Sequence, residues 1–146
     1  MPLRYVKGNA LNSPKQTLCC TVNCVGVMGA GIAKSVRDAY PEVFKVYREL
    51  CFSGELTIDS LFTVDTHIEN RQVLLFPTKQ HWRYPSKTEW IEYNLSRLSE
   101  DYELLEIESL AMVPPGGSLG KIPRNIVNAL VEKYLGHPPI EIDYYG

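Results

Sequence analysis

Three segments of the sequence carry residue types that can bind an anion or act as a nucleophile, and each follows a strand-like run. The first is VNCVGVMGAGIAKSV, in which Asn23 ends a hydrophobic run and Gly26, Gly29 and Gly31 precede a helical pattern. Glycines let a ligand approach the backbone, and free N–H groups at a helix start attract phosphate. The segment is neither a P-loop, because no GK[ST] follows, nor a GxGxxG motif. Taken alone, it fits a tight strand-to-helix turn equally well.

The second segment is PPGGSLGKIP, residues 114–123, which again leads from a strand through glycines into a helix. Two such loops in one small domain can hold a diphosphate from two sides with backbone amides. Little net positive charge is then needed, which suits a chain with a net charge of -2.

The third segment is FPTKQHWRYPSK, residues 76–87, in which Lys79 follows a buried run and His81, Trp82 and Arg83 come next. A cation beside an aromatic ring can serve a ligand or a reaction, although a solvated loop lysine is the simple alternative. A nucleophilic lysine needs a neutral amine, which requires desolvation or neighbouring cations such as Arg83 or Lys87.

Other chemistries find no support in the sequence. It has no GxSxG motif and no spacing that suggests a Cys–His pair. Four cysteines without a CxxC and three histidines without ligand spacing argue against a zinc site, so we expect no metal and reduced, mostly buried thiols. The carboxylates Asp59, Asp65, Glu89 and Glu92 lie in contexts typical of solvated faces.

The composition predicts one domain over residues 1–146, because 45% hydrophobic residues are enough for a core. We expect no membrane span, since no apolar run reaches about 18 residues. The first residues lack the apolar core of a signal peptide, so we expect a cytoplasmic protein without further domains, acting as a stand-alone enzyme.

Hydrophobic patterning predicts alternating strands and helices. We expect strands within residues 3–8, 17–23, 60–66, 72–79, 107–115 and 140–145, and helices within 31–40, 41–54, 86–105 and 116–136. Pro41 and Pro123 suit first turns, Ser86 or Thr88 suits a capping position, and Gly136 suits a C-terminal cap. The order predicts an α/β fold with a mixed, largely parallel sheet covered on both faces. Such sheets bind ligands beyond the carboxyl ends of their strands, where the three segments would meet.

The motifs YVKGNAL, VNCVGVMGAGIA, FPTKQHWR and SLAMVPPGG, in this order over nearly the whole chain, resemble those of a macro domain. The branch that they resemble is the terminal ADP-ribose glycohydrolase group, which includes DarG-type antitoxin domains. The resemblance implies a three-layer α/β/α fold that binds ADP-ribose.

The resemblance also implies a role for each segment. Asn23 would contact the distal ribose hydroxyls, the segment 29–33 would reach the phosphates, and the loop 116–121 would wrap the diphosphate. The position that usually carries an adenine-binding Asp is Asn9, whose side-chain oxygen still accepts a hydrogen bond. The implied ADP-ribose contacts are Gly8, Asn9, Ala10, Val22, Gly29, Ala30, Gly31, Ile32, Ala33, Pro115, Gly116, Gly117, Ser118, Leu119, Gly120 and Lys121.

Lys79 matches the catalytic lysine of this branch, so the resemblance implies Lys79 and Asn23 as the catalytic pair. Residues 114–125 contain no Asp or Glu, and they depart from the branch's usual loop by being shorter and by carrying Lys121. Lys121 would pair with a phosphate or face solvent.

The implied function is hydrolysis of mono-ADP-ribose from a modified substrate, foremost ADP-ribosylated thymidine in DNA, without a cofactor. His81, Trp82 and Arg83 would then contact single-stranded DNA transiently, unless Trp82 packs beneath its loop. A non-catalytic ADP-ribose reader and an ADP-ribose 1″-phosphate phosphatase are the alternatives. We expect a monomer.

Overall fold

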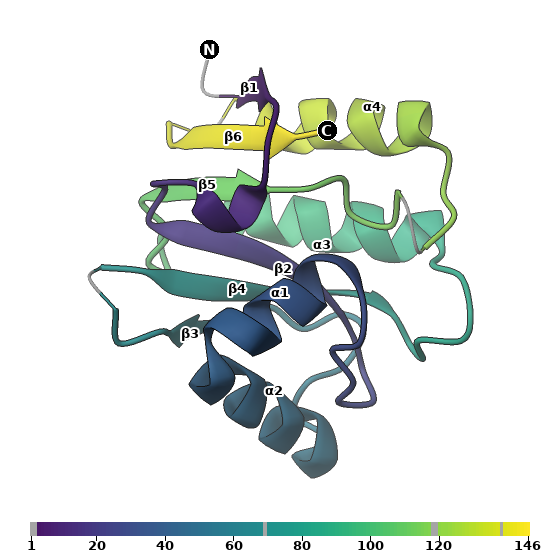
Figure 1. The fold of residues 1–146 in the computed structure, drawn as a ribbon. Coiled ribbons are helices and arrows are strands. Elements are labelled where there is room, and N and C mark those ends of the chain that lie inside the picture. The colour runs from purple at the N-terminus through teal and green to yellow at the C-terminus, as the bar shows by residue number, and fades with distance from the viewer. Residues whose placement is uncertain (1–2, 69, 118–119, 138) are drawn as a thin grey trace.

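A computed structural model describes residues 3–68, 70–117, 120–137 and 139–146. Its strands are β1 (Leu3–Val6), β2 (Thr17–Asn23), β3 (Phe62–Asp65), β4 (Gln72–Lys79), β5 (Ser109–Met112) and β6 (Glu141–Tyr145). Within these ranges they form one sheet in the order β1-β6-β5-β2-β4-β3 (Figure 1). Neighbours run parallel except β3, which lies antiparallel to β4 at the edge. The prediction of a mixed, largely parallel sheet is confirmed.

The helices are α1 (Gly31–Ala39), α2 (Pro41–Ser53), α3 (Thr88–Asp101) and α4 (Arg124–Leu135), with a short 3-10 helix, η1 (Ala10–Asn12). Pro41 occupies the first turn of α2, as predicted, and Gly54 ends this helix with a φ of 81°. In the parts of the chain described above, no helix combines the length and the apolar character that crossing a membrane requires.

The predicted capping of α3 is wrong. The residue before the helix is Lys87, and no side chain caps the first turn. Thr88 is already helical, and the Ser86 hydroxyl is buried without a partner among the described residues.

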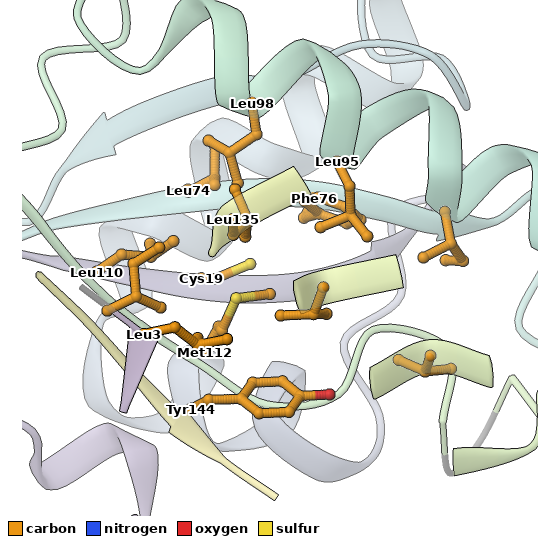
Figure 2. Packing of buried hydrophobic residues seen from close by; sticks show 14 of the residues in the cluster. Leu3, Cys19, Leu74, Phe76, Leu95, Leu98, Leu110, Met112, Leu135 and Tyr144 are labelled. Atoms are coloured by element: carbon orange, nitrogen blue, oxygen red, sulfur yellow. The ribbon is translucent and has the colours of Figure 1, made fainter. Parts of the chain in front are cut away.

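Helices cover both faces of the sheet and make three layers. Helices α3 and α4 pack on one face, where Leu95, Leu98 and Leu135 meet sheet residues such as Cys19 and Leu110 (Figure 2). Helices α1 and α2 pack on the other face (Figure 1), where they contribute Ala33, Val36, Val43 and Tyr47 to a second buried cluster.

Burial on both faces explains the uniformly apolar sequence of β2. Cys19 belongs to the cluster under α3 and α4, whereas Cys20 belongs to the cluster under α1 and α2. The four cysteines are free thiols, with Cys24 and Cys51 only partly buried. The expectation of thiols that pack as small hydrophobic groups is confirmed for the β2 pair.

The parallel strands bring the predicted segments to one edge of the sheet. β2 and β4 are neighbours, and Asn23 lies directly across from Lys79. The register shifts between Val22 and Asn23, so the end of β2 carries an irregularity of the kind often found beside active sites. The two residues implied as catalytic therefore face the same end of the fold.

Asn94 ties α3 to this edge. Its buried side-chain amide donates to the Pro77 carbonyl at 3.0 Å and to the Ile58 carbonyl at 2.8 Å. The first bond joins the helix to the backbone two residues before Lys79.

We predict that Asn94→Ala lowers the free energy of unfolding by about 2–3 kcal/mol, because it leaves two inward-facing carbonyls without a donor. Urea denaturation followed by circular dichroism measures the change. Asn125→Ala, at an exposed position in the first turn of α4, is the matched control and should change stability by less than about 0.5 kcal/mol. Equal effects of the two variants would contradict the role of Asn94.

Candidate functional site

A cavity of about 390 Å³ opens at the carboxyl ends of β2, β4 and β5. Its volume lies in the range typical of small-molecule sites. The lining residues are Thr21, Val22, Asn23, Val27, Gly29, Ala30, Gly31, Ile32, Ala33, Thr78, Lys79, Trp82, Val113, Pro114, Gly116 and Gly120. The first loop, the second loop and the Lys79 segment therefore share one cavity.

Asn23 shapes the first loop, the stretch between β2 and α1. Its Oδ1 accepts hydrogen bonds from the Tyr47 hydroxyl at 2.8 Å, from the Val25 N–H at 3.1 Å and from the Val27 N–H at 3.4 Å. Its Nδ2 donates to the Val27 carbonyl at 2.8 Å. These bonds occupy the oxygen and one of the two amide hydrogens. One Nδ2 hydrogen is left for a ligand in the cavity.

The start of α1 faces the cavity without a side-chain cap. Ala30 is the N-cap residue, and it makes no side-chain hydrogen bond to the helix. The first-turn N–H groups of a helix have no partner within the helix, so those of Gly31, Ile32 and Ala33 are available to an anion. All three residues line the cavity.

The glycines here fall into two kinds. Gly31 has a φ of 59° and Gly26 a φ of 83°, a conformation that the backbone itself requires. Gly29 is different, because a Cβ at this position would meet only the Val27 side chain, at an ordinary 3.7 Å. The fold does not demand a glycine at position 29, and this residue lines the cavity, where the lack of a side chain lets a ligand approach the backbone.

The second loop is closely packed. Gly116 has a φ of 76°, and a Cβ on Gly120 would lie 2.6 Å from the Gly116 Cα and against the Ser86 hydroxyl. The Ser86 N–H donates to the Gly120 carbonyl at 3.0 Å, so this loop is joined to the segment that follows β4. Of the implied contacts in the loop, Ser118 and Leu119 lie outside the described residues.

Lys79 lies half-buried at the end of β4. Its ammonium nitrogen Nζ donates to the Trp82 carbonyl at 3.0 Å, which directs the side chain along the cavity wall. Burial lowers the pKa of the Lys79 amine below its usual range, and the charge of Lys121 lowers it further. The pKa is shifted in the direction that a nucleophilic lysine needs, and the neighbouring cation is Lys121 rather than Arg83 or Lys87.

Aromatic and cationic side chains cluster after Lys79. Trp82 is 49% exposed, and its ring centroid lies 5.1 Å from that of His81. The Arg83 guanidinium lies 5.4 Å from the Trp82 ring centroid, and Tyr84 packs on His81 at 5.6 Å. Trp82 does not pack beneath its loop, and it offers a ring surface at the cavity.

Gly8, Asn9 and Ala10 lie outside the cavity lining. Ala10 packs in the same buried cluster as Val22 and Ala33, which do line the cavity. The Asn9 Oδ1 accepts from the Leu11 N–H at 3.0 Å and caps η1, which leaves one lone pair for another donor.

Sequence reasoning missed five lining residues: Thr21, Val27, Thr78, Val113 and Pro114. Each lies next to a strand end or a glycine that was identified. Their closeness in the sequence to those positions was the signal that could have identified them as lining residues. Five of the residues named from the sequence are not part of the lining, although each is a close neighbour in sequence of a residue that is: Pro115, Gly117, Lys121, His81 and Arg83.

Comparisons with known proteins agree with this geometry. The family model described as Macro domain matches residues 19–131. The DNA ADP-ribosyl glycohydrolase of Mycobacterium tuberculosis is 38% identical over 146 residues, which cover 98% of this chain and 42% of that protein. This chain spans about two fifths of the length of the curated relatives that it matches.

Two solved structures are similar over almost all of this chain. The macrodomain of Mycobacterium tuberculosis DarG superposes with a TM-score of 0.91 at 38% identity, covering 98% of this chain and 96% of that one. Thermosipho africanus DarTG in complex with ADP-ribose superposes with a TM-score of 0.89 at 34% identity, covering 98% of this chain and 41% of that one.

The two kinds of glycine lead to opposite predictions for stability. Gly120→Ala should destabilise the protein by several kcal/mol, on the order of 3, because the new methyl group overlaps the Gly116 backbone. Gly29→Ala should leave the unfolding midpoint within about 2 °C of wild type, because the methyl group makes only an ordinary van der Waals contact with the Val27 side chain. Thermal unfolding of both variants tests the assignment, which fails if Gly29→Ala is the more damaging change.

Proposed function

The chain belongs to the macro domain family, and we propose that it removes ADP-ribose from ADP-ribosylated DNA. The observation that carries the proposal is Lys79, a partly buried amine with a lowered pKa that lies directly across from Asn23 at the rim of a glycine-lined cavity. Relatives named DNA ADP-ribosyl glycohydrolase, at 36–38% identity over more than nine tenths of this chain, support the substrate class.

The proposed binding mode assigns each part of ADP-ribose to one region of the site. The diphosphate would lie between the uncapped start of α1 and the second loop, where backbone N–H groups can donate to its oxygens. The adenosine would extend toward the Gly8–Ala10 segment, past the apolar side chains of Ile32 and Val113. The distal ribose would then lie between Asn23 and Lys79.

The proposed reaction uses the Lys79 amine in its neutral form. A neutral Lys79 amine forms a bond to the anomeric carbon of the distal ribose while the bond from that carbon to the nucleobase breaks. The base leaves with the electron pair and takes up the proton that the Lys79 nitrogen loses as its bond to carbon forms. Water then attacks the same carbon, to which its hydroxyl becomes bonded, while its other proton goes to the departing Lys79 nitrogen. This step releases ADP-ribose and returns the free amine.

The surroundings of Lys79 favour this chemistry. The Trp82 carbonyl accepts one N–H, so the direction of the amine is set before the substrate binds. Lys121 disfavours the protonated form, since two nearby cations repel each other. Because residues 114–125 contain no Asp or Glu, the second loop supplies no carboxylate that could act as a general acid or base.

The exposed ring of Trp82, with Arg83 stacked on it, suits a DNA strand. Single-stranded nucleic acids are bound by aromatic stacking of bases and by cations along the backbone. A strand that carries the modified base at Lys79 would pass beside this ring. The net charge of -2 favours a transient contact over tight binding.

Lys79→Ala is predicted to lower ADP-ribose release from an ADP-ribosylated thymidine oligonucleotide by at least about a hundredfold, because the nucleophile is lost. Release is measured by chromatography of the products, and binding of free ADP-ribose by calorimetry. The variant should still bind ADP-ribose. A wild-type protein that binds ADP-ribose and releases none from DNA would instead be a reader, and the proposed function would fail.

Removing the neighbouring charge should shift the pH dependence. In Lys121→Ala the pKa of Lys79 returns toward its usual, higher range, so the amine becomes neutral only at higher pH. The rising limb of kcat/KM against pH should therefore move to higher pH, with a lower rate at neutral pH that recovers on raising the pH. Lys121→Arg keeps the repulsion and should keep the limb near the wild-type position. An unmoved limb in Lys121→Ala would contradict the electrostatic role of Lys121.

A further inference from the structure

The exposed face of α2 carries an aromatic and cationic stack that the proposed reaction does not use. Phe44, Arg48 and Phe52 follow one another at helical spacing, four residues apart. The Arg48 guanidinium lies 5.5 Å from the Phe44 ring centroid and 5.4 Å from that of Phe52. Phe52 is 69% exposed, which is unusual for so large an apolar side chain. We refer to these three side chains as the α2 stack.

The α2 stack is continuous with the cavity. A Cβ on Gly26 would lie 3.3 Å from Phe52 Cε1 and 3.7 Å from Arg48 Cγ, so the first loop rests directly on the stack. Val25 and Val27 of the same loop are 37% and 42% exposed, and Val27 lines the cavity. A strip of apolar surface therefore runs from the cavity rim to Phe52.

The same loop also adjoins the Trp82 segment. The Cys24 N–H donates to the Gln80 carbonyl at 3.4 Å, which joins the first loop to the residues after β4. The Trp82 segment leads into α3 on one face of the sheet, whereas the α2 stack lies on the other face (Figure 1). The first loop, which forms part of the cavity wall, thus adjoins two aromatic surfaces, each with an arginine against a ring.

The distribution of charge indicates what this surface binds. Ion pairs with carboxylates involve Arg4, Lys15, Lys34, Arg37, Arg97 and Lys133. In the described part of the chain, no such pair involves Arg48, Lys79, Arg83 or Lys121. These four cations can therefore pair with an external anion, although the chain as a whole is slightly acidic. In the described residues they share the lack of an ion pair with Lys7, Lys45, Arg71, Lys87 and Arg124, so it is the aromatic rings beside Arg48 and Arg83 that distinguish this surface.

We propose that the α2 stack is a second platform for nucleobases, which binds the substrate strand on the α2 side of the mouth while Trp82 binds it on the α3 side. The proposal rests on the proposed function for its substrate. A base stacks on the exposed Phe52 ring, and Arg48 is close enough to the same ring to neutralise the adjoining phosphate.

If the α2 stack binds a base, KM should depend on the length of the substrate strand. A modified mononucleoside fills the cavity and can contact Trp82 in its lining, but it does not extend to Phe52, whereas an oligonucleotide with the modified base at its centre reaches both aromatic surfaces. Wild type should therefore process the oligonucleotide with a lower KM than the mononucleoside. This advantage should fall with rising salt, because it includes phosphate contacts.

The test compares wild type, Phe52→Ala and Arg48→Gln on both substrates. Each variant should raise KM for the ADP-ribosylated oligonucleotide by about tenfold, in line with the loss of one stacked base, with kcat little changed. The loss of kcat/KM that each variant shows on the oligonucleotide should exceed its loss of kcat/KM on the mononucleoside by about fivefold or more. Equal losses on both substrates, or none on either, would overturn the proposal.

Arg97→Gln is the matched control. Arg97 also stacks on an aromatic ring, with its guanidinium 5.8 Å from the Tyr93 centroid on α3, but Asp101 neutralises it at 3.2 Å. It should behave as wild type on both substrates. Thermal unfolding of the three variants checks that each is folded, and Phe52 and Arg48 are exposed enough for this to be expected.

A binding measurement separates this proposal from the proposed function. Fluorescence anisotropy of a labelled, unmodified oligothymidylate at low salt reports on the surface without any hydrolysis. Phe52→Ala and Arg48→Gln should each weaken binding several-fold, and Arg97→Gln should not. If wild type binds the strand through these residues yet releases no ADP-ribose, the proposed function fails and the platform stands. If wild type hydrolyses the modified strand, and both variants bind the oligothymidylate and hydrolyse the modified strand as well as wild type does, the platform proposal is contradicted and the proposed function is not.

Discussion

The hydroxyl of Tyr47 is the buried contact on which the geometry of the site depends. It lies 2.8 Å from both the backbone oxygen and the Oδ1 of Asn23, and its ring is fully buried under α2. Burial keeps the pKa of the hydroxyl well above its usual range, so it remains a donor. Its bond to Asn23 holds α2 against the end of β2. Because Asn23 Oδ1 also receives two N–H groups of the first loop, this contact sets the path of the loop before any ligand arrives.

The position of Lys79 follows from the same edge of the sheet. Parallel pairing of β2 with β4 puts the two strand ends side by side, and the shift in register at Val22 and Asn23 brings Asn23 across from Lys79. Asn94 fixes the backbone just before Lys79 from the opposite face. Helices from both layers therefore secure the two residues, one through Tyr47 and the other through Asn94. A rigid scaffold of this kind holds two side chains in a defined relative position, which the proposed reaction requires of Lys79 and Asn23.

The charge near the cavity differs from the net charge of the chain. The chain is slightly acidic, yet cations near the mouth keep no carboxylate partner in the described residues, whereas most cations on the outer helices and β1 do. Anion binding can then rely on helix N–H groups and a few unpaired side chains rather than on net charge. The closeness of Lys79 and Lys121 has a second effect, since the repulsion that favours a neutral amine comes from the loop that adjoins the cavity.

The sequence by itself determined the elements, the mixed sheet and the segments that meet at the cavity, because hydrophobic periodicity and glycine placement are local signals. It identified Asn23, Lys79 and both glycine-rich loops, since each comes directly after a buried strand. It did not determine the bonds of Asn23 to Tyr47, the effect of Lys121 on Lys79, or the contact between Phe52 and Gly26. These depend on residues 24 to 42 positions apart, and only the packing of helices on the sheet brings them together. The failed capping prediction at Ser86 has the same cause, because Gly120 of the second loop packs against that hydroxyl.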